Sequence, residues 1–279
     1  MMKHINKKSL FIIVILLFCV FIPGCSTLNN LQVKVGLKNS DFEYINQGKV
    51  KSITIQSTRD QGFRFVVTDQ KAITELYDIL SSAKKAKQKS NLKPDYIFEI
   101  DETNNKVLKF NYIVGLDKKN YGNLYNNNNV YIVSNRIDND IITNFWNIRT
   151  PPNDFKSIYY GSVKDALNEY FKNKDKNKTI GINFDDDVDA ARFILSTELD
   201  EFTSDIKSEF KNSSIVNQDK DKYDILVTVK TEGYKSTLYK LTVTFWDKSQ
   251  QNEKKYYIIN SYKNTRWDTT ISENKPDTF

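Results

Sequence analysis

Very few side chains in this sequence could perform nucleophilic or metal chemistry. The chain has 279 residues but only two cysteines and one histidine. Cys19, Cys25 and His4 all lie close to the N-terminus. The rest of the chain therefore has no Ser-His-Asp or Cys-His arrangement and no zinc site built from histidine and cysteine. It also has no phosphate-binding glycine loop and no G-x-S-x-G, so we expect no enzyme and no cofactor.

The densest group of carboxylates is the stretch "NFDDDVD" at 183–189. Asp185, Asp187 and Asp189 are candidate calcium ligands, because calcium prefers carboxylate oxygens. The spacing does not follow the EF-hand pattern, which needs a glycine at the turn and a glutamate at the end of the loop. Acidic residues are also favoured at the start of a helix, where they cap it and complement its dipole. We expect this structural role, and no metal, with the three aspartates as weak candidates.

The first 24 residues have the pattern of a secretory signal peptide. Lys3, Lys7 and Lys8 form a basic head, and the run from Leu10 to Ile22 that follows is apolar. A helix that spans a bilayer needs about 20 apolar residues, so this run is too short for an ordinary span. The sequence therefore predicts a signal peptide at 1–24.

The end of this segment, Ile22-Pro23-Gly24-Cys25, resembles the lipobox of bacterial lipoproteins. The resemblance implies cleavage between Gly24 and Cys25 and attachment of a diacylglycerol to the Cys25 thiol, with fatty acyl chains such as palmitate. Two or more acyl chains give stable membrane anchoring. The expected location is the outer face of the cell membrane, with residues 25–45 as a flexible tether. The alternative is an ordinary signal anchor that contains a cysteine by chance.

The charge of the exported chain is close to neutral. Loss of residues 1–24 lowers lysine plus arginine from 41 to 38 and leaves all 35 acidic residues, a net charge of about +3. This charge gives no argument for nucleic acid, and we expect none as a partner. The membrane is the expected partner through the anchor, together with a cell-wall or protein partner.

Residues 46–149 are predicted to form a small α+β domain. Alternating β-branched and aromatic residues indicate strands, and apolar residues three and four apart indicate helices. Thr68 or Asp69 is expected to cap the first helix. Strands are expected at 50–56, 62–67, 94–100, 106–114 and 129–134, and helices at 68–86 and 138–146.

Several segments of this first half resemble the YhfM-like domain of lipoproteins from spore-forming Gram-positive bacteria. They are the entry into the expected hairpin, "LKPDYIFEI", and the closing "VYIVS" and "NFW". The resemblance covers about 49–147 and implies a fold type and a surface location. It implies no catalytic residue.

The second half follows a proline-containing linker at 150–160 and is expected to form another α+β domain at 161–279. Helices are predicted at 163–171 and 185–210, the longer one kinked or split near Ser196. Strands are predicted at "TIGINF" and at 223–231, 237–246 and 255–262, with a β-bulge near Lys240. The simplest fold is two small domains, each a mostly antiparallel sheet packed with one or two helices.

Two further surfaces have a functional and a structural interpretation. Aromatic residues near the C-terminus could bind a sugar or peptide, but core packing is favoured. They are Tyr256, Tyr257, Tyr262 and Trp267. The lysines at 84–89 could contact anionic lipids or teichoic acid, but a solvated helix end is favoured.

Three functions remain open from the sequence. The first is a membrane-anchored, non-catalytic surface lipoprotein that serves as a binding or assembly module. The second is a cell-envelope hydrolase that uses carboxylates. The third is an assembly factor in sporulation or germination, which only the family resemblance suggests.

Overall fold

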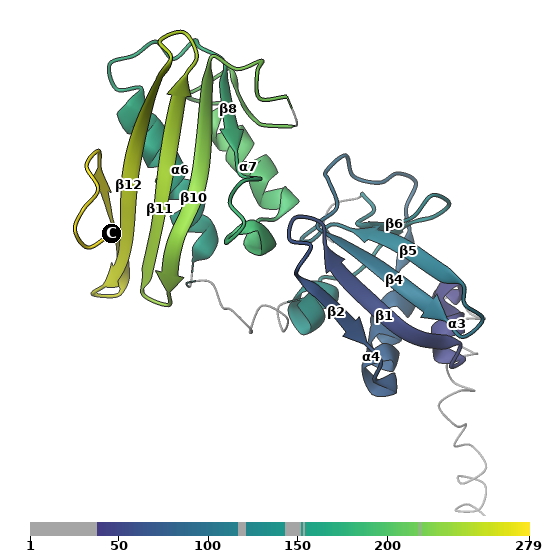
Figure 1. The fold of residues 1–279 in the computed structure, drawn as a ribbon. Coiled ribbons are helices and arrows are strands. Elements are labelled where there is room, and N and C mark those ends of the chain that lie inside the picture. Colours follow the sequence, from purple (N-terminus) through teal and green to yellow (C-terminus); the bar gives the residue numbers. More distant parts are fainter. Residues whose placement is uncertain (1–37, 117–120, 143–151, 153, 218) are drawn as a thin grey trace, which may run out of the picture.

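The computed structural model describes residues 38–116, 121–142, 152, 154–217 and 219–279. The chain forms two lobes side by side, each built on one sheet with helices against it (Figure 1). The sheets have seven and six strands, and each lobe has its own large hydrophobic core. The predicted α+β fold class is confirmed.

The first lobe contains a sheet of order β2-β1-β4-β5-β6-β7-β3, which is antiparallel throughout. Its helical elements are η1 (Ser40–Phe42), α3 (Glu43–Asn46), α4 (Gln70–Ser81) and the π-helical turn η2 (Ile137–Ile142). Its strands are β1 (Val50–Ser57), β2 (Arg64–Val67), β3 (Lys84–Lys85), β4 (Tyr96–Glu102), β5 (Val107–Tyr112), β6 (Leu124–Tyr125) and β7 (Val130–Ile132).

Helix α4 forms where the apolar spacing predicts it. The Asp69 carboxylate accepts a hydrogen bond from the Ala72 amide at 2.9 Å and so caps the helix. Ile73, Leu76 and Tyr77 are buried on the side of α4 that faces the core. The helix ends at Ser81, so Lys84 and Lys85 do not lie at its end. They form β3 and pair with β7.

The first lobe includes residues that precede the expected boundary at residue 46. Phe42 and Ile45, at the end of the segment expected to be a tether, are buried in the core. The hydroxyl of Tyr131 donates to the Asp41 carboxylate at 2.7 Å and joins this segment to β7. Residues 40–45 are therefore part of the folded lobe.

The second lobe has the strand order β13-β12-β11-β10-β8-β9. Strand β8 runs parallel to β10 and β9, and the other pairs are antiparallel. Its helices are α6 (Phe155–Tyr170), η3 (Ala191–Phe193) and α7 (Ser196–Ile206). Its strands are β8 (Ile180–Asn183), β9 (Ser213–Ile215), β10 (Ile225–Lys235), β11 (Leu238–Asp247), β12 (Asn252–Lys263) and β13 (Arg266–Ser272).

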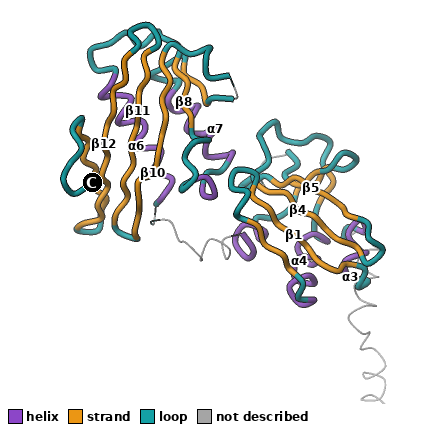
Figure 2. Tube along the Cα trace, viewed as in Figure 1, coloured by secondary structure: helices purple, strands orange, loops and turns teal. Residues whose placement is uncertain are grey.

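Helix α6 packs against β11 and β12 (Figure 2). It also contacts β13, and α7 contacts β9. The contact between α6 and the sheet is largely aromatic. The rings of Tyr170 and Phe245 stack with their centroids 4.2 Å apart, and Phe245 also contacts Tyr256 edge to face. Because α6 begins at Phe155, half of the segment expected to be a linker at 150–160 is helical.

The helix predicted at 185–210 is much shorter in the structure. Residues 184–190 form turns, η3 follows, and α7 begins only at Ser196. The expected split near Ser196 is confirmed, because Leu195 has an extended backbone with φ −108° and ψ 146°. Leu195 belongs to the hydrophobic core of the first lobe, whereas Phe202 belongs to that of the second.

The strand pair β10 and β11 contains the expected irregularity, but on β10. The register shifts between Thr231 and Gly233, opposite Leu241 and Lys240. Strand β11 alternates regularly and places Tyr239, not its neighbour Leu238, on the buried face. No break in β11 is therefore needed.

Candidate functional site

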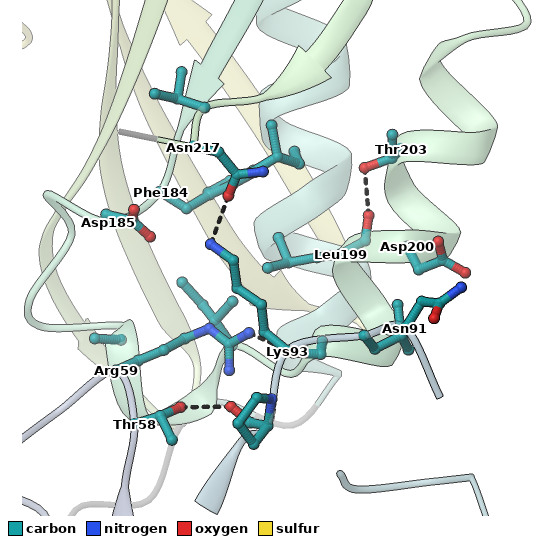
Figure 3. Close-up of a pocket in the computed structure, with 17 residues that line it drawn as sticks. Thr58, Arg59, Asn91, Lys93, Phe184, Asp185, Leu199, Asp200, Thr203 and Asn217 are labelled. Atoms are coloured by element: carbon teal, nitrogen blue, oxygen red, sulfur yellow. Dashed lines mark hydrogen bonds between the residues drawn. The ribbon is translucent and has the colours of Figure 1, made fainter. Parts of the chain in front are cut away.

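A cavity of about 640 Å³ lies between the two lobes (Figure 3). The first lobe contributes the loop after β1, including Arg59, and the segment before β4, including Lys93. The second lobe contributes Asp185 after β8, Asp200 on α7 and Asn217 after β9. Pockets of roughly 300–1,000 Å³ at domain interfaces are typical ligand sites. We call this cavity the interlobe cleft.

The walls of the interlobe cleft combine apolar and polar groups. Leu92 and Pro94 come from the first lobe, and Phe184, Leu199 and Ile215 come from the second. Figure 3 shows the Lys93 side chain reaching from the first lobe toward Asn217 of the second. Its ammonium donates to the Asn217 side-chain oxygen at 2.5 Å.

Asp95 joins the two lobes at the base of the interlobe cleft. Its side chain is 1% exposed, and its Oδ1 accepts from the Arg59 guanidinium at 2.7 Å. The same oxygen accepts from the Ser196 amide at 2.8 Å, while Oδ2 accepts from the Val114 amide at 3.0 Å. Leu195, at the N-cap position of α7, makes no side-chain capping bond. A carboxylate of the first lobe therefore caps a helix of the second.

Neighbouring contacts support this junction. Arg59 also donates to the Ser196 hydroxyl at 2.6 Å. Arg192 of η3 forms an ion pair with Asp60 at 3.0 Å and lies over the Phe63 ring, 5.2 Å from its centroid. Together with the buried Leu195, these groups hold the segment before α7 against the first lobe.

Glu198, in the first turn of α7, is the carboxylate with the most altered acidity near the junction. Burial raises the pKa of Glu198 to about 7, and the negative charge of Asp95 adds to this effect. Lys156 and a hydrogen bond from the Leu195 backbone act in the opposite direction. One Glu198 oxygen and the Tyr160 hydroxyl are buried without a hydrogen-bond partner among the described residues.

Asp95 and Glu198 do not face the interlobe cleft. Neither residue lines it, and both oxygens of Asp95 already accept hydrogen bonds from the protein. A pair of catalytic carboxylates must reach the bond that is cleaved. In this geometry the two carboxylates serve the junction between the lobes and do not present a reactive pair to the cleft.

The three candidate calcium ligands do not converge. Asp187 is buried and accepts from the Thr231 amide at 3.0 Å and from the hydroxyls of Thr231 and Tyr159, both at 2.8 Å. Burial raises the pKa of Asp187, and these hydrogen bonds oppose the rise. Asp185 is exposed and lines the cleft, whereas Asp189 is half-buried. Within the described ranges, no three or more His, Cys, Asp or Glu residues are placed to hold a metal ion.

Asp187 instead supports the β-bulge. The Thr231 amide, at the position where the β10 register shifts, donates to Asp187.

The candidate aromatic surface is divided as expected from core packing. Tyr256 is buried, whereas Tyr262 is 40% exposed and contacts Trp267.

The anchoring residues Gly24 and Cys25 lie outside the described residues, as does the apolar run before them. Among the helices of the described ranges, none combines the length and the apolar character that a membrane span requires. The predicted signal peptide and lipidation therefore stay predictions.

Comparison with protein families identifies the family to which the first lobe is similar. Residues 46–151 match the family model described as YhfM protein. This segment is a YhfM-like domain. The match contains the whole contribution of the first lobe to the cleft, including Arg59 and Lys93, and also Asp95 at the junction between the lobes. The second lobe lies beyond the match, and no curated protein and no solved structure matches the chain.

Part of the cleft comes from a stretch with a recognisable sequence pattern, but that pattern does not indicate a binding function. Lys93, Pro94 and Asp95 occur in "LKPDYIFEI", which indicated the entry into a hairpin. The YhfM-like domain uses Lys93 and Asp95 of this stretch to contact its neighbour. Asp95 and Ser196 are 101 residues apart, and no local pattern predicts that they meet.

Proposed function

We propose that this protein is a lipid-anchored, non-catalytic binding or assembly module on the outer face of the cell membrane, and that the interlobe cleft is its ligand site. The observation that carries the proposal is the cleft itself, about 640 Å³ in volume and lined by both lobes. The YhfM-like domain and the lipobox-like Ile22–Cys25 support the location.

The anchor is tested by mass spectrometry of the mature N-terminus. We expect a diacylglyceryl group on Cys25 and the absence of residues 1–24. Cys25→Ser should accumulate as an uncut precursor without acyl chains, whereas the control Cys19→Ser should be processed normally. A free Cys25 thiol on an uncut wild-type chain would exclude the anchor.

The ligand site is tested by cross-linking on intact cells. A photoreactive amino acid replaces Thr203, which lines the cleft, or Asp221, an exposed residue of the same lobe that does not line it. We expect a discrete cross-linked product from position 203 and none from position 221. The same products from both positions, or none from 203, would contradict a ligand site in the cleft. A stable multi-protein complex at 203 would favour the assembly role, including one in sporulation or germination.

A further inference from the structure

The charges of the interlobe cleft indicate the chemistry of its ligand. Four charged side chains line it: Arg59, Lys93, Asp185 and Asp200. The charge of Arg59 is balanced by Asp95, which lies behind the cleft wall. Lys93 contacts the neutral amide of Asn217. The two aspartates therefore leave the open part of the cleft with one more negative charge than positive.

Asp185 and Asp200 are available to a ligand. Both residues are exposed, and neither carboxylate has an ion-pair or hydrogen-bond partner among the residues that the structure describes. Figure 3 shows them on opposite sides of Lys93. A ligand that fills the cleft would thus meet a carboxylate near either end and an ammonium between them.

We propose that the ligand of the cleft is a short peptide segment with a basic side chain beside apolar ones. This inference rests on the proposed function of the cleft as a ligand site. The basic group pairs with Asp185 or Asp200, and a peptide carbonyl replaces Asn217 as the acceptor for Lys93. The side-chain amides of Asn91 and Asn217 can donate to and accept from a peptide backbone. Leu199 and its apolar neighbours provide the surface for the apolar side chains.

A neutral glycan fits this lining less well. It carries no cation for the two carboxylates and no anion for Lys93. Its hydroxyl groups can donate to the carboxylates and accept from Lys93, but they form no ion pair, and hydrogen bonds between two charged groups are stronger than those to a neutral group. A peptide supplies a cation, carbonyl acceptors and apolar surface together.

The proposal is tested with three acetylated and amidated peptides, Leu-Lys-Leu, Leu-Gln-Leu and Leu-Glu-Leu, titrated calorimetrically into the full-length chain in non-ionic detergent. We expect the lysine peptide to bind about fivefold more tightly than the glutamine peptide, the upper range for one partly exposed ion pair. The glutamate peptide should bind most weakly. The preference for lysine should decrease as salt is added, because salt screens exposed charges.

Charge-removing variants assign the preference to the cleft. The double variant Asp185→Asn/Asp200→Asn should lose the preference for lysine and bind the glutamine peptide as the wild type does. Asp221→Asn is the matched control, because Asp221 is an exposed aspartate of the same lobe outside the cleft. It should keep the wild-type preference.

Three results would overturn the proposal. The first is equal binding of all three peptides, and the second is an equal loss of preference in Asp221→Asn. The third is binding of chitotetraose by the wild type when no peptide binds. In each case the cross-linking from position 203 still decides independently whether the cleft is a ligand site at all.

Discussion

Glu198 should make the stability of the folded chain depend on pH near neutrality. In the unfolded chain its pKa has the ordinary value of 4.5, whereas burial raises it to about 7 in the folded chain. Between these pH values the folded state retains a proton that the unfolded state has lost. The free energy of unfolding therefore falls as the pH rises from 4.5 to 7, and the contribution of protonated Glu198 is lost above that range.

The size of the effect follows from the change in pKa. A rise from 4.5 to about 7 corresponds to about 3 kcal/mol, at 1.36 kcal/mol for each pH unit. Glu198→Gln keeps the shape of the side chain and removes its charge. The variant should therefore exceed the wild type in stability by up to about 3 kcal/mol at pH 8 and match it at pH 4.5.

Urea denaturation followed by circular dichroism measures the difference at each pH. Comparing variant with wild type at the same pH removes the contributions of other carboxylates, such as Asp247, whose pKa is lowered to about 2. Asp200→Asn is the control, because Asp200 is exposed on the same helix and has no side-chain partner among the described residues. An advantage of Glu198→Gln that is the same at pH 4.5 and pH 8 would refute the argument.

Two further predictions concern buried residues. Asp187→Ala should lower the free energy of unfolding by at least about 2 kcal/mol, because three buried donors lose their acceptor, whereas Asp185→Ala should change it by less than about 0.5 kcal/mol. Equal effects in urea denaturation would contradict the structural role of Asp187. Leu195→Ala should cost about 2–5 kcal/mol and raise amide hydrogen exchange in the YhfM-like domain as well as in α7, since Leu195 fills the core of that domain. Faster exchange in α7 alone would contradict this packing.

Local sequence patterns predicted the elements whose contacts are local. Asp69 and the apolar residues after it specify α4 without reference to the rest of the fold. The hairpin of β4 and β5 was also predictable, because a polar turn separates two alternating runs. In the structure Asn105 occupies this turn with φ +65°, a conformation that asparagine tolerates better than most residues. Short strands such as β3 and β6 have two residues each and no periodicity to detect.

The segment 185–210 shows where periodicity misleads. Val188, Leu195 and Phe202 are spaced like one face of a helix, but they occupy three different environments. Val188 is 74% exposed, Leu195 is buried in the core of the first lobe, and Phe202 is buried in the core of the second. A pattern of apolar residues indicates that side chains will be buried, but it does not say against which surface.

The interlobe cleft was not predictable for a related reason. Its four charged residues come from four separate stretches of the sequence, and only Asp185 belongs to a cluster of charges with a recognisable pattern, the acidic stretch at 183–189. Their arrangement depends on Asp95, which caps α7 across a separation of 101 residues. Ser196 gives a second polar contact at the same point, because its hydroxyl accepts from Arg59. The helix that carries Asp200 is thus oriented by the YhfM-like domain, and the walls of the cleft are fixed only when both lobes have folded and joined.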